Sequence, residues 1–328
     1  MEAANHGLSR GTWASYNSAF KALQKFAAEK NENLSFPLGQ KQILAFIAFL
    51  ANKNLSAKTI NVYLAGIRQY HLVAGVELPT IRSPLVNLII EGKKHQDILH
   101  KKTQGDKSRL PMTPTMMLLL KEELRIDATL ENKDKLLIWA VATLAFNGAF
   151  RIHELLARKT SSFDPNFSLL GRDISLKSVP IGKQKVDAIQ VLIKSEKKDR
   201  VGAGVRVDVY ESKGPLCPVN AYKKWLKKTG YAPAKKPAFL FSSGKPLTGK
   251  TMNALLKKFL SKHLQSTKRK ISSHSFRGGI ASLMGELGFS DSDIMAIGRW
   301  SSRSFEAYLK LPRTKRVEMA RKLGKLGL

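Results

Sequence analysis

Cysteine, acidic residues and long apolar runs are all scarce in this chain of 328 residues. Cys217 is the single cysteine, so no internal disulfide can form, and we expect a reducing compartment and no secretion. The longest apolar runs, residues 43–51 and 136–146, fall short of the roughly 20 residues that a membrane-spanning helix needs. No histidine or cysteine spacing resembles a zinc site. We therefore expect neither a membrane partner nor a metal, and no cofactor.

The shortage of acidic residues leaves a strongly basic chain. It has 56 Lys and Arg against 25 Asp and Glu, a net charge of +31. Residues 1–105 carry 13 basic and 6 acidic side chains, whereas residues 212–285 carry 16 basic and no acidic ones. A stretch whose charged side chains are all positive is typical of a surface that follows a phosphate backbone. Nucleic acid, DNA or RNA, is the expected partner; a merely soluble basic protein is the alternative.

The spacing of apolar residues predicts a mainly α fold in two domains. Residues 1–91 read as a bundle of four helices, with the last a short helix over 84–91. His71 falls on a buried row of this bundle and is expected to be a core histidine. Residues 92–113 are polar and basic with Gly and Pro, which is typical of an interdomain linker. The second domain, residues 114–328, reads as helices with a small antiparallel sheet.

In the second domain the apolar run 136–146 predicts a buried helix that stops near Gly148. Residues 187–194 and 204–211 predict a hairpin with a basic tip. Further helices are predicted over 218–229, 250–265 and 274–288.

The helix over 274–288 begins with an unusual set of residues. His274 and Arg277 stand one turn apart on one face, followed by Gly278 and Gly279, each costing about 0.8–1 kcal/mol relative to Ala. A helix start offers N–H groups to an anion. The glycines either let DNA or a neighbouring segment approach the backbone, or allow tight packing within the domain.

Two further segments carry candidate chemistry. Arg151 follows the buried helix in apolar surroundings, where its planar fork needs a carboxylate or phosphate, and Glu154 one turn later could hold it. Downstream, Trp300 follows a short helix capped by a Ser290–Asp293 box, and Tyr308 lies on a last short helix. Taken singly, Trp300 and Tyr308 are expected to be packing residues.

In this order, "FRIHELLA", the basic hairpin, "HSFRGGIAS", "GRWSS" and "FEAYL" resemble the tyrosine recombinase (phage integrase) family along the whole chain. The ending is most similar to recombinases of eukaryotic mobile elements, of the Crypton and tyrosine-recombinase retrotransposon types. Trp300 stands where many bacterial relatives carry histidine, and Tyr308 follows it by eight residues, one fewer than in bacterial integrases. The resemblance implies an N-terminal SAM-like core-binding bundle and a catalytic domain with the DNA breaking-rejoining fold.

The resemblance also implies an enzyme that cuts and rejoins DNA without metal or nucleotide. Arg151 and Arg277 would neutralise the phosphorane-like state, and Tyr308 would attack phosphorus to form a 3′-phosphotyrosyl ester. His274 would exchange protons with the nucleophile or bind the phosphate, and Trp300 would donate its indole N–H. A lysine of the hairpin tip would protonate the leaving oxygen: Lys197 aligns best, with Lys198 and Lys194 as alternatives.

The expected partner is double-stranded DNA, gripped by both domains in a C-shaped clamp. The basic residues expected to contact it are Lys58, Arg68, Lys101, Lys102, Lys198, Lys268, Arg269 and Lys270. The resemblance implies that the C-terminal tail docks on the next protomer to form a homotetramer in the synaptic complex, whereas the free protein is expected to be a monomer or weak dimer. Residence would be nuclear for a eukaryotic element and cytoplasmic otherwise. A type IB topoisomerase and a domesticated DNA-binding protein that no longer cuts are the alternatives.

Overall fold

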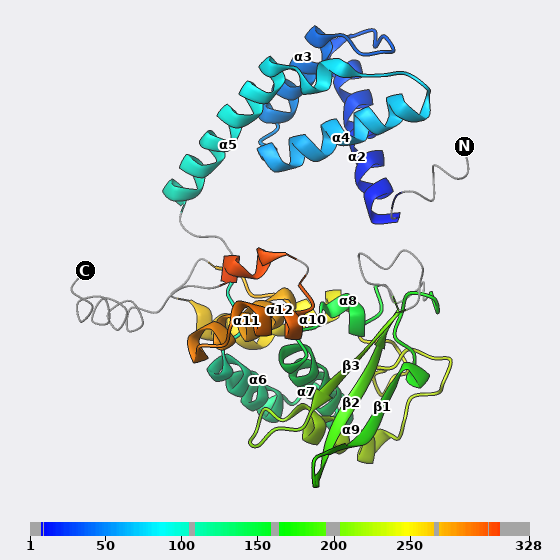
Figure 1. Cartoon of the computed structure of the whole chain (residues 1–328), viewed down its shortest axis with the longest axis vertical. Coiled ribbons are helices and arrows are strands. Elements are labelled where there is room, and N and C mark those ends of the chain that lie inside the picture. Colours follow the sequence, from blue (N-terminus) through cyan, green and yellow to red (C-terminus); the bar gives the residue numbers. More distant parts are fainter. Residues whose placement is uncertain are drawn as a thin grey trace, which may run out of the picture. The chain divides into compact units, whose positions relative to one another are not determined.

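The computed structural model describes residues 8, 10–104, 109–158, 164–194, 204–265, 269–300 and 302–308. Of Arg10, residues 101–104, Ala307 and Tyr308 it describes the backbone alone. The chain divides into two compact units, Met1–Asp106 and Lys107–Leu328 (Figure 1). Among the described helices, none is both long enough and apolar enough to cross a membrane.

The first unit is helical throughout its described elements. They are α2 (Arg10–Lys30), α3 (Gln40–Asn52), α4 (Ala57–Val73), the 3₁₀ helix η1 (Pro79–Arg82) and α5 (Pro84–Gln104). Ser56 caps α4 as its position predicts, because its hydroxyl accepts the Thr59 N–H at 3.2 Å. His71 is fully buried, with Nδ1 2.8 Å from the Ile67 carbonyl and Nε2 accepting the Leu38 N–H at 3.3 Å. It is a core histidine, as predicted.

The prediction of a short helix over 84–91 followed by a linker was wrong, because α5 continues to Gln104. No proline interrupts residues 85–104, so nothing stops the helix there. Asp97 also gives the added turns a contact: its carboxylate accepts the Ala57 N–H at the start of α4 at 2.7 Å and pairs with Lys93. A carboxylate at a helix N-terminus is stabilising. Most of the predicted linker is therefore part of a long helix.

The second unit combines helices with one small sheet. Its helices are α6 (Pro114–Ile126), α7 (Asn132–Asn147), α8 (Ile152–Leu155), η2 (Gly171–Asp173), α9 (Pro218–Thr229), α10 (Gly249–Leu260), η3 (Ser261–Leu264), α11 (His274–Leu287), α12 (Asp291–Gly298) and η4 (Arg303–Tyr308). Helix α7 is the centre of the core: residues 137–146 are all buried, and α6, α9 and α11 pack around it.

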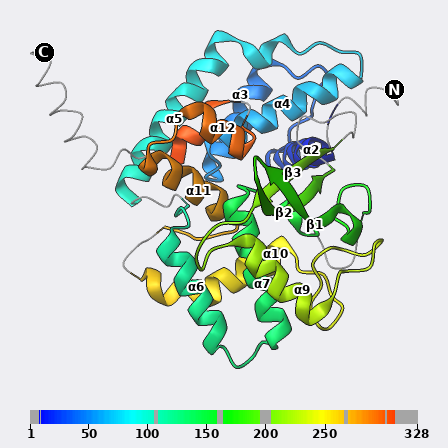
Figure 2. The same ribbon diagram turned by 60° about the horizontal axis from the view of Figure 1, so that its bottom comes forward.

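The sheet has three antiparallel strands in the order β1 (Ile174–Ile181), β2 (Gln184–Ile193) and β3 (Val205–Tyr210), side by side in Figures 1 and 2. The predicted hairpin is β2 and β3, and β1 was not predicted. Ala188, Ile189 and Val191 on β2 are buried, and α9 contacts β2 and β3. The mainly α fold with a small antiparallel sheet is confirmed.

Candidate active site

The turn after α7 presents Arg151 and Glu154. Gly148 ends α7, Ala149 follows with φ +47°, and Arg151 precedes α8. The Glu154 carboxylate accepts the Arg151 backbone N–H at 2.9 Å and its Nη1 at 2.8 Å. The Glu154 side chain is 5% exposed, whereas that of Arg151 is 38% exposed. Glu154 therefore holds Arg151 as predicted, and leaves its guanidinium partly open to solvent.

Arg277 comes to the same turn from α11. It is 5% exposed, and its Nη1 donates to the Ala149 carbonyl at 2.7 Å while its Nη2 donates to the Gly298 carbonyl. Its guanidinium carbon also lies 4.4 Å from the centre of the Trp300 ring, a cation–π contact. Arg277 thus joins three segments that are far apart in the sequence: the end of α7, α11 and the end of α12.

Trp300 and Tyr308 lie on the segment after α12. The Trp300 ring folds back over Gly298, where a Cβ atom would come within 1.6 Å of the ring. It also packs on Phe305, with ring centres 5.9 Å apart. Phe305 is fully buried against Ala281, Met284 and Ile294, which anchors η4 on α11. The backbone of Tyr308 ends η4, and its side chain lies outside the described residues.

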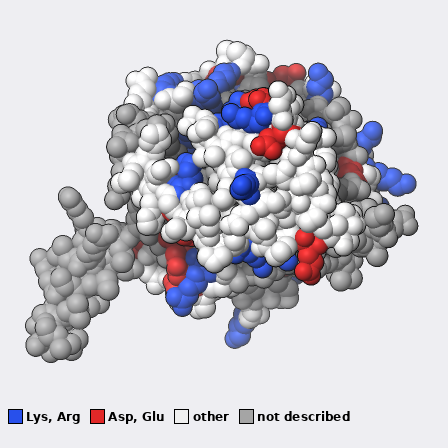
Figure 3. Space-filling view, turned by 90° about the horizontal axis from the view of Figure 1, so that it is seen from above, with Lys and Arg blue, Asp and Glu red and all other residues white. Residues whose placement is uncertain are grey.

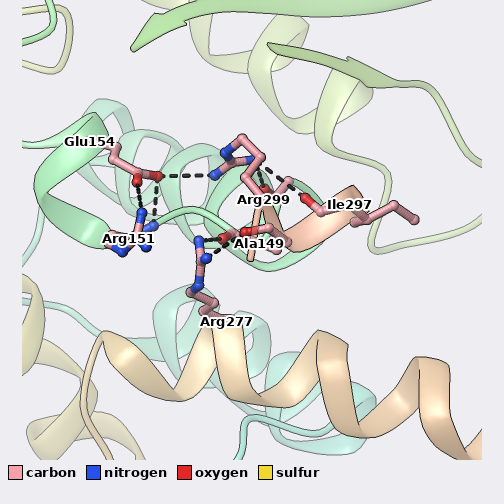
Figure 4. A network of polar contacts seen from close by, with 8 residues as sticks. Ala149, Arg151, Glu154, Arg277, Ile297 and Arg299 are labelled. Carbon is pink, nitrogen blue, oxygen red and sulfur yellow. Dashed lines mark hydrogen bonds and ion pairs between the residues drawn. The ribbon is translucent and has the colours of Figure 1, made fainter. Parts of the chain in front are cut away.

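Arg299, for which no role was predicted, completes the cluster. Its Nη2 donates to Glu154 at 3.0 Å, and its Nη1 donates to the Gly148 carbonyl at 3.0 Å (Figure 4). Glu154 therefore lies between two guanidinium groups. The only signal in the sequence was the place of Arg299 in "GRW", beside a residue already singled out.

His274 is the first residue of α11 and is half-buried. Burial lowers the pKa of its imidazole, and the charges of Arg109, His153, Arg151 and Arg277 lower it further. The neutral imidazole is therefore the dominant form at neutral pH, and it can accept a proton. The start of unit 2 brings Arg109 here, because Leu110 N–H donates to the Lys270 carbonyl at 2.9 Å.

The adjacent glycines Gly278 and Gly279 of α11 are explained in part by packing. A Cβ atom on Gly279 would lie 1.9 Å from the Met112 carbonyl oxygen, so α11 touches the backbone of the segment before α6. The Met112 N–H also donates to the Ser275 carbonyl at 2.8 Å. Of the two explanations left open by the sequence, tight packing within the unit accounts for Gly279.

The candidate lysines fall at the end of β2. Lys197 and Lys198 lie outside the described residues. Lys194 forms an ion pair with Asp173 at 2.5 Å and donates to the Pro165 carbonyl at 2.9 Å. The side chains of Lys194 and Asp173 are 16% and 5% exposed. Lys194 is thus engaged in holding the base of the hairpin.

The other basic residues expected to meet DNA are placed unevenly. Lys58 is exposed on α4, and Arg68 lines a hollow of about 400 Å³ with Asn61, Gln69, Arg82 and Asn87. Lys270 is exposed, and Arg269 donates to the Arg109 carbonyl at 3.0 Å. The side chains of Lys101, Lys102 and Lys268 lie outside the described residues. On the face in Figure 3, basic side chains stand among neutral ones and a few acidic ones, not in one continuous patch.

The cluster suits the binding of a doubly charged group. Two guanidinium groups, those of Arg151 and Arg299, share the Glu154 carboxylate, and the guanidinium of Arg277 is held by backbone carbonyl groups of the same turn and of the end of α12. A half-buried neutral imidazole lies at the start of α11. Preorganised positive charge of this kind stabilises an anionic transition state. Among the described residues no group of His, Cys, Asp and Glu could hold a metal ion.

The fold is that of the tyrosine recombinases. Residues 3–75 match the family model of the phage integrase N-terminal SAM-like domain. The chain superposes on the Tn1549 transposon integrase in complex with transposon right end DNA, with a TM-score of 0.58 over 96% of this chain and 95% of that one, at 14% identity.

Two lambda integrase structures are similar to the same degree. A dimer bound to a COC′ core site gives a TM-score of 0.59 over 93% of this chain and 90% of that one, at 12% identity. A tetramer bound to a Holliday junction gives 0.58 over 92% and 72%, also at 12% identity. Comparison with curated protein sequences found no match. The chain therefore has an integrase-type N-terminal domain and a tyrosine recombinase fold.

Proposed function

We propose that this protein is a site-specific DNA recombinase of a mobile element. It cuts and rejoins DNA through a 3′-phosphotyrosyl intermediate. The observation that carries the proposal is the convergence of Arg151 and Arg277, which are 126 residues apart in the chain, on one turn next to Glu154 and Trp300. The structural likeness to integrases whose structures contain bound DNA supports a DNA substrate.

In the proposed reaction the Tyr308 hydroxyl attacks the scissile phosphorus, and the 5′ oxygen leaves. Arg151 and Arg277 neutralise the non-bridging oxygens. His274, neutral at the start, accepts the phenolic proton, and Trp300 donates its indole N–H to the phosphate. The leaving oxygen takes a proton from a lysine of the β2–β3 tip. Rejoining reverses these steps on a different strand.

The tip lysine is proposed to be Lys197, with Lys198 as the alternative. Lys194 takes a structural role, because Asp173 and the Pro165 carbonyl hold it. Replacing Lys197 and Lys198 together by Ala should abolish strand cleavage and leave the melting temperature unchanged. Replacing Lys194 by Met should lower the melting temperature, because it leaves the nearly buried Asp173 carboxylate unpaired. Normal cleavage by the double variant would refute the assignment.

Both units are proposed to contact the duplex. In the N-terminal unit, Arg68 and Arg82 carry positive charge beside three amide side chains in the α4–α5 hollow, a set that suits phosphate and base edges. Four protomers would assemble on two duplexes through the C-terminal tail, which lies outside the described residues. A eukaryotic mobile element would require residence in the nucleus.

The test is a covalent trap. A duplex selected from a random pool by binding to the protein is nicked beside the cleavage site, so that the short leaving fragment diffuses away. The wild type should form a protein–DNA adduct that resists detergent, and Tyr308→Phe should bind the duplex equally but form none.

The alternatives give different results in the same experiment. A DNA-binding protein that no longer cuts would bind the duplex without any adduct. A type IB topoisomerase would form the adduct and relax supercoiled plasmid, but it would yield no product joining two duplexes. Either outcome would contradict the proposal.

A further inference from the structure

Arg299 follows the end of a helix, but its side chain is nearly buried and makes several contacts. Its side chain is 12% exposed. Besides its bonds to Glu154 and the Gly148 carbonyl, its guanidinium carbon lies 4.8 Å from the centre of the Phe150 ring. All of these contacts are with the α7–α8 turn that presents Arg151.

The backbone at Arg299 is in a conformation that arginine rarely adopts. It follows the last residue of α12 with φ +52° and ψ +42°, the left-handed region where Gly is usual at the end of a helix. For a residue with a Cβ atom this conformation is strained. Ala149, in the turn that Arg299 contacts, also has a positive φ. When a residue in a strained conformation has a side chain held by an ion pair, a backbone carbonyl and an aromatic ring, that side chain is expected to have a function.

The contacts of Arg299 distribute the charge of Glu154. One carboxylate oxygen accepts Arg151 Nη1, and the other accepts both the Arg151 N–H and Arg299 Nη2. With both arginines present, the three side chains carry a net charge of one positive unit. Without Arg299 the carboxylate would neutralise Arg151 alone, which would weaken the attraction of Arg151 for a phosphate.

Arg299 also locates the segment that leads to the proposed nucleophile. It precedes Trp300 directly, and its bond to the Gly148 carbonyl lies next to the bond from Arg277 to the Ala149 carbonyl. Two arginines thus tie the end of α12 to the end of α7 at adjacent carbonyl groups. η4 and Tyr308 follow within a few residues.

We propose that Arg299 is a positioning residue for phosphoryl transfer, which acts through Glu154 on Arg151 and through the α12 turn on Trp300. The inference rests on the proposed function. It predicts that losing the Arg299 side chain slows formation of the covalent adduct without weakening DNA binding or the fold.

The key variant is Arg299→Gly, because glycine adopts the left-handed conformation without strain and so should not lower the melting temperature. We expect adduct formation on the nicked duplex to be about 10- to 100-fold slower in a single turnover, with duplex affinity unchanged. Arg299→Lys, which keeps a charge near Glu154, should recover part of the rate. Arg303→Ala, at an exposed arginine of η4 paired with Glu306, is the matched control and should react like the wild type.

A second substrate separates positioning from general loss of structure. When a methyl group replaces one non-bridging oxygen of the scissile phosphate, the linkage carries no charge and depends less on the arginines. The defect of Arg299→Gly should then be several-fold smaller than on the natural phosphate. A purely structural defect would be equal on the two substrates.

The outcomes are distinct. Absence of any adduct with the wild type overturns the proposed function, and this inference with it. An adduct with the wild type but an equal or faster rate for Arg299→Gly overturns the inference alone. An equal defect of Arg299→Gly on the two substrates also overturns the inference, and so does a rate for Arg299→Lys that is no faster than that of Arg299→Gly. If Arg299→Gly does not fold, Arg299→Lys is compared with the wild type on both substrates. Its defect should then be smaller on the uncharged linkage than on the natural phosphate, and an equal defect overturns the inference.

Discussion

At the scale of single residues, the centre of the site is an unequal set of charges. The Glu154 carboxylate contacts Arg151 and Arg299, and the backbone carbonyl groups of Ala149 and Gly298 hold Arg277. A carbonyl orients a guanidinium without cancelling its charge. The cluster therefore keeps the net positive charge that the proposed binding of a phosphate needs, and the same charge acts on His274.

The pKa of His274 provides a test of the positive charge around it. Burial is the largest cause of its lowering, and Arg109 is the first of the charges that add to it. Arg109→Gln removes a positive charge that disfavours the imidazolium, so the pKa of His274 should rise towards its ordinary value. The measurement is an NMR titration of the free protein, with the His274 signal identified by its loss in His274→Gln.

The lowered pKa of His274 also determines how the stability of the fold depends on pH. A lowered pKa means that the folded protein binds the proton less tightly than the unfolded chain does, so this group removes stability as the pH falls from about 6.5. In Arg109→Gln that loss should be smaller. Arg303→Gln, which is not among the groups acting on His274, is the control. An unchanged or lower pKa in Arg109→Gln would contradict this account of the site.

At the scale of elements, α11 is the scaffold of the site. It carries His274 and Arg277, supports η4 through Phe305, and contacts α7 and the backbone at Met112. Such close contact requires a glycine at position 279. The penalty in helix propensity, about 1 kcal/mol, is smaller than the cost of separating the two backbones.

Two Gly→Ala substitutions compare the gain in helix propensity with the loss of close packing. Gly279→Ala should lower the free energy of unfolding by about 1–3 kcal/mol, because backbone atoms of Met112 occupy the space of the new methyl group. Gly92→Ala, within α5, meets no atom within 4 Å and should raise it by about 0.5–1 kcal/mol. Urea denaturation monitored by circular dichroism measures both. Equal effects at the two positions would contradict the packing explanation of Gly279.

At the scale of the whole molecule, charge is divided unequally between the units. Residues 107–328 carry 43 Lys and Arg and 18 Asp and Glu, so most of the net charge of +31 belongs to the unit with the candidate site. Binding that neutralises phosphates weakens steeply with salt. For the proposed recombinase we therefore expect this unit to supply most of the affinity for DNA, and contacts with base edges to supply sequence discrimination.

The C-terminal tail is the basis of the prediction for the assembly. Residues 313–328 combine six basic residues with apolar Val317, Met319, Leu323 and Leu326. Deleting residues 314–328 should leave binding to a single duplex within about threefold of the wild type, a change below 1 kcal/mol, and should abolish the complex of four protomers on two duplexes. Native gel shifts and light scattering separate these two effects. Unaltered assembly of the truncated protein would contradict the proposed role.

Local patterns were sufficient for much of the fold. Ser56 and Ser290 cap helices where their positions predict, and apolar spacing located α7, α9 and the β2–β3 hairpin. These features depend on residues within a few positions of one another. The extension of α5 was missed because it is stabilised by Asp97 reaching the start of α4, 40 residues away. Strand β1 was missed because its pairing with β2 compensates for a weak local pattern.

The same division holds for the site. The order of motifs, through its resemblance to the tyrosine recombinases, made Arg151, Glu154, His274, Arg277, Trp300 and Tyr308 candidates. Only the tertiary structure decided that Arg299 shares Glu154 with Arg151 across 145 residues, and that Lys194 is occupied by Asp173. Contacts between distant residues depend on how helices pack, and packing is determined by the whole core and not by any one segment of the chain.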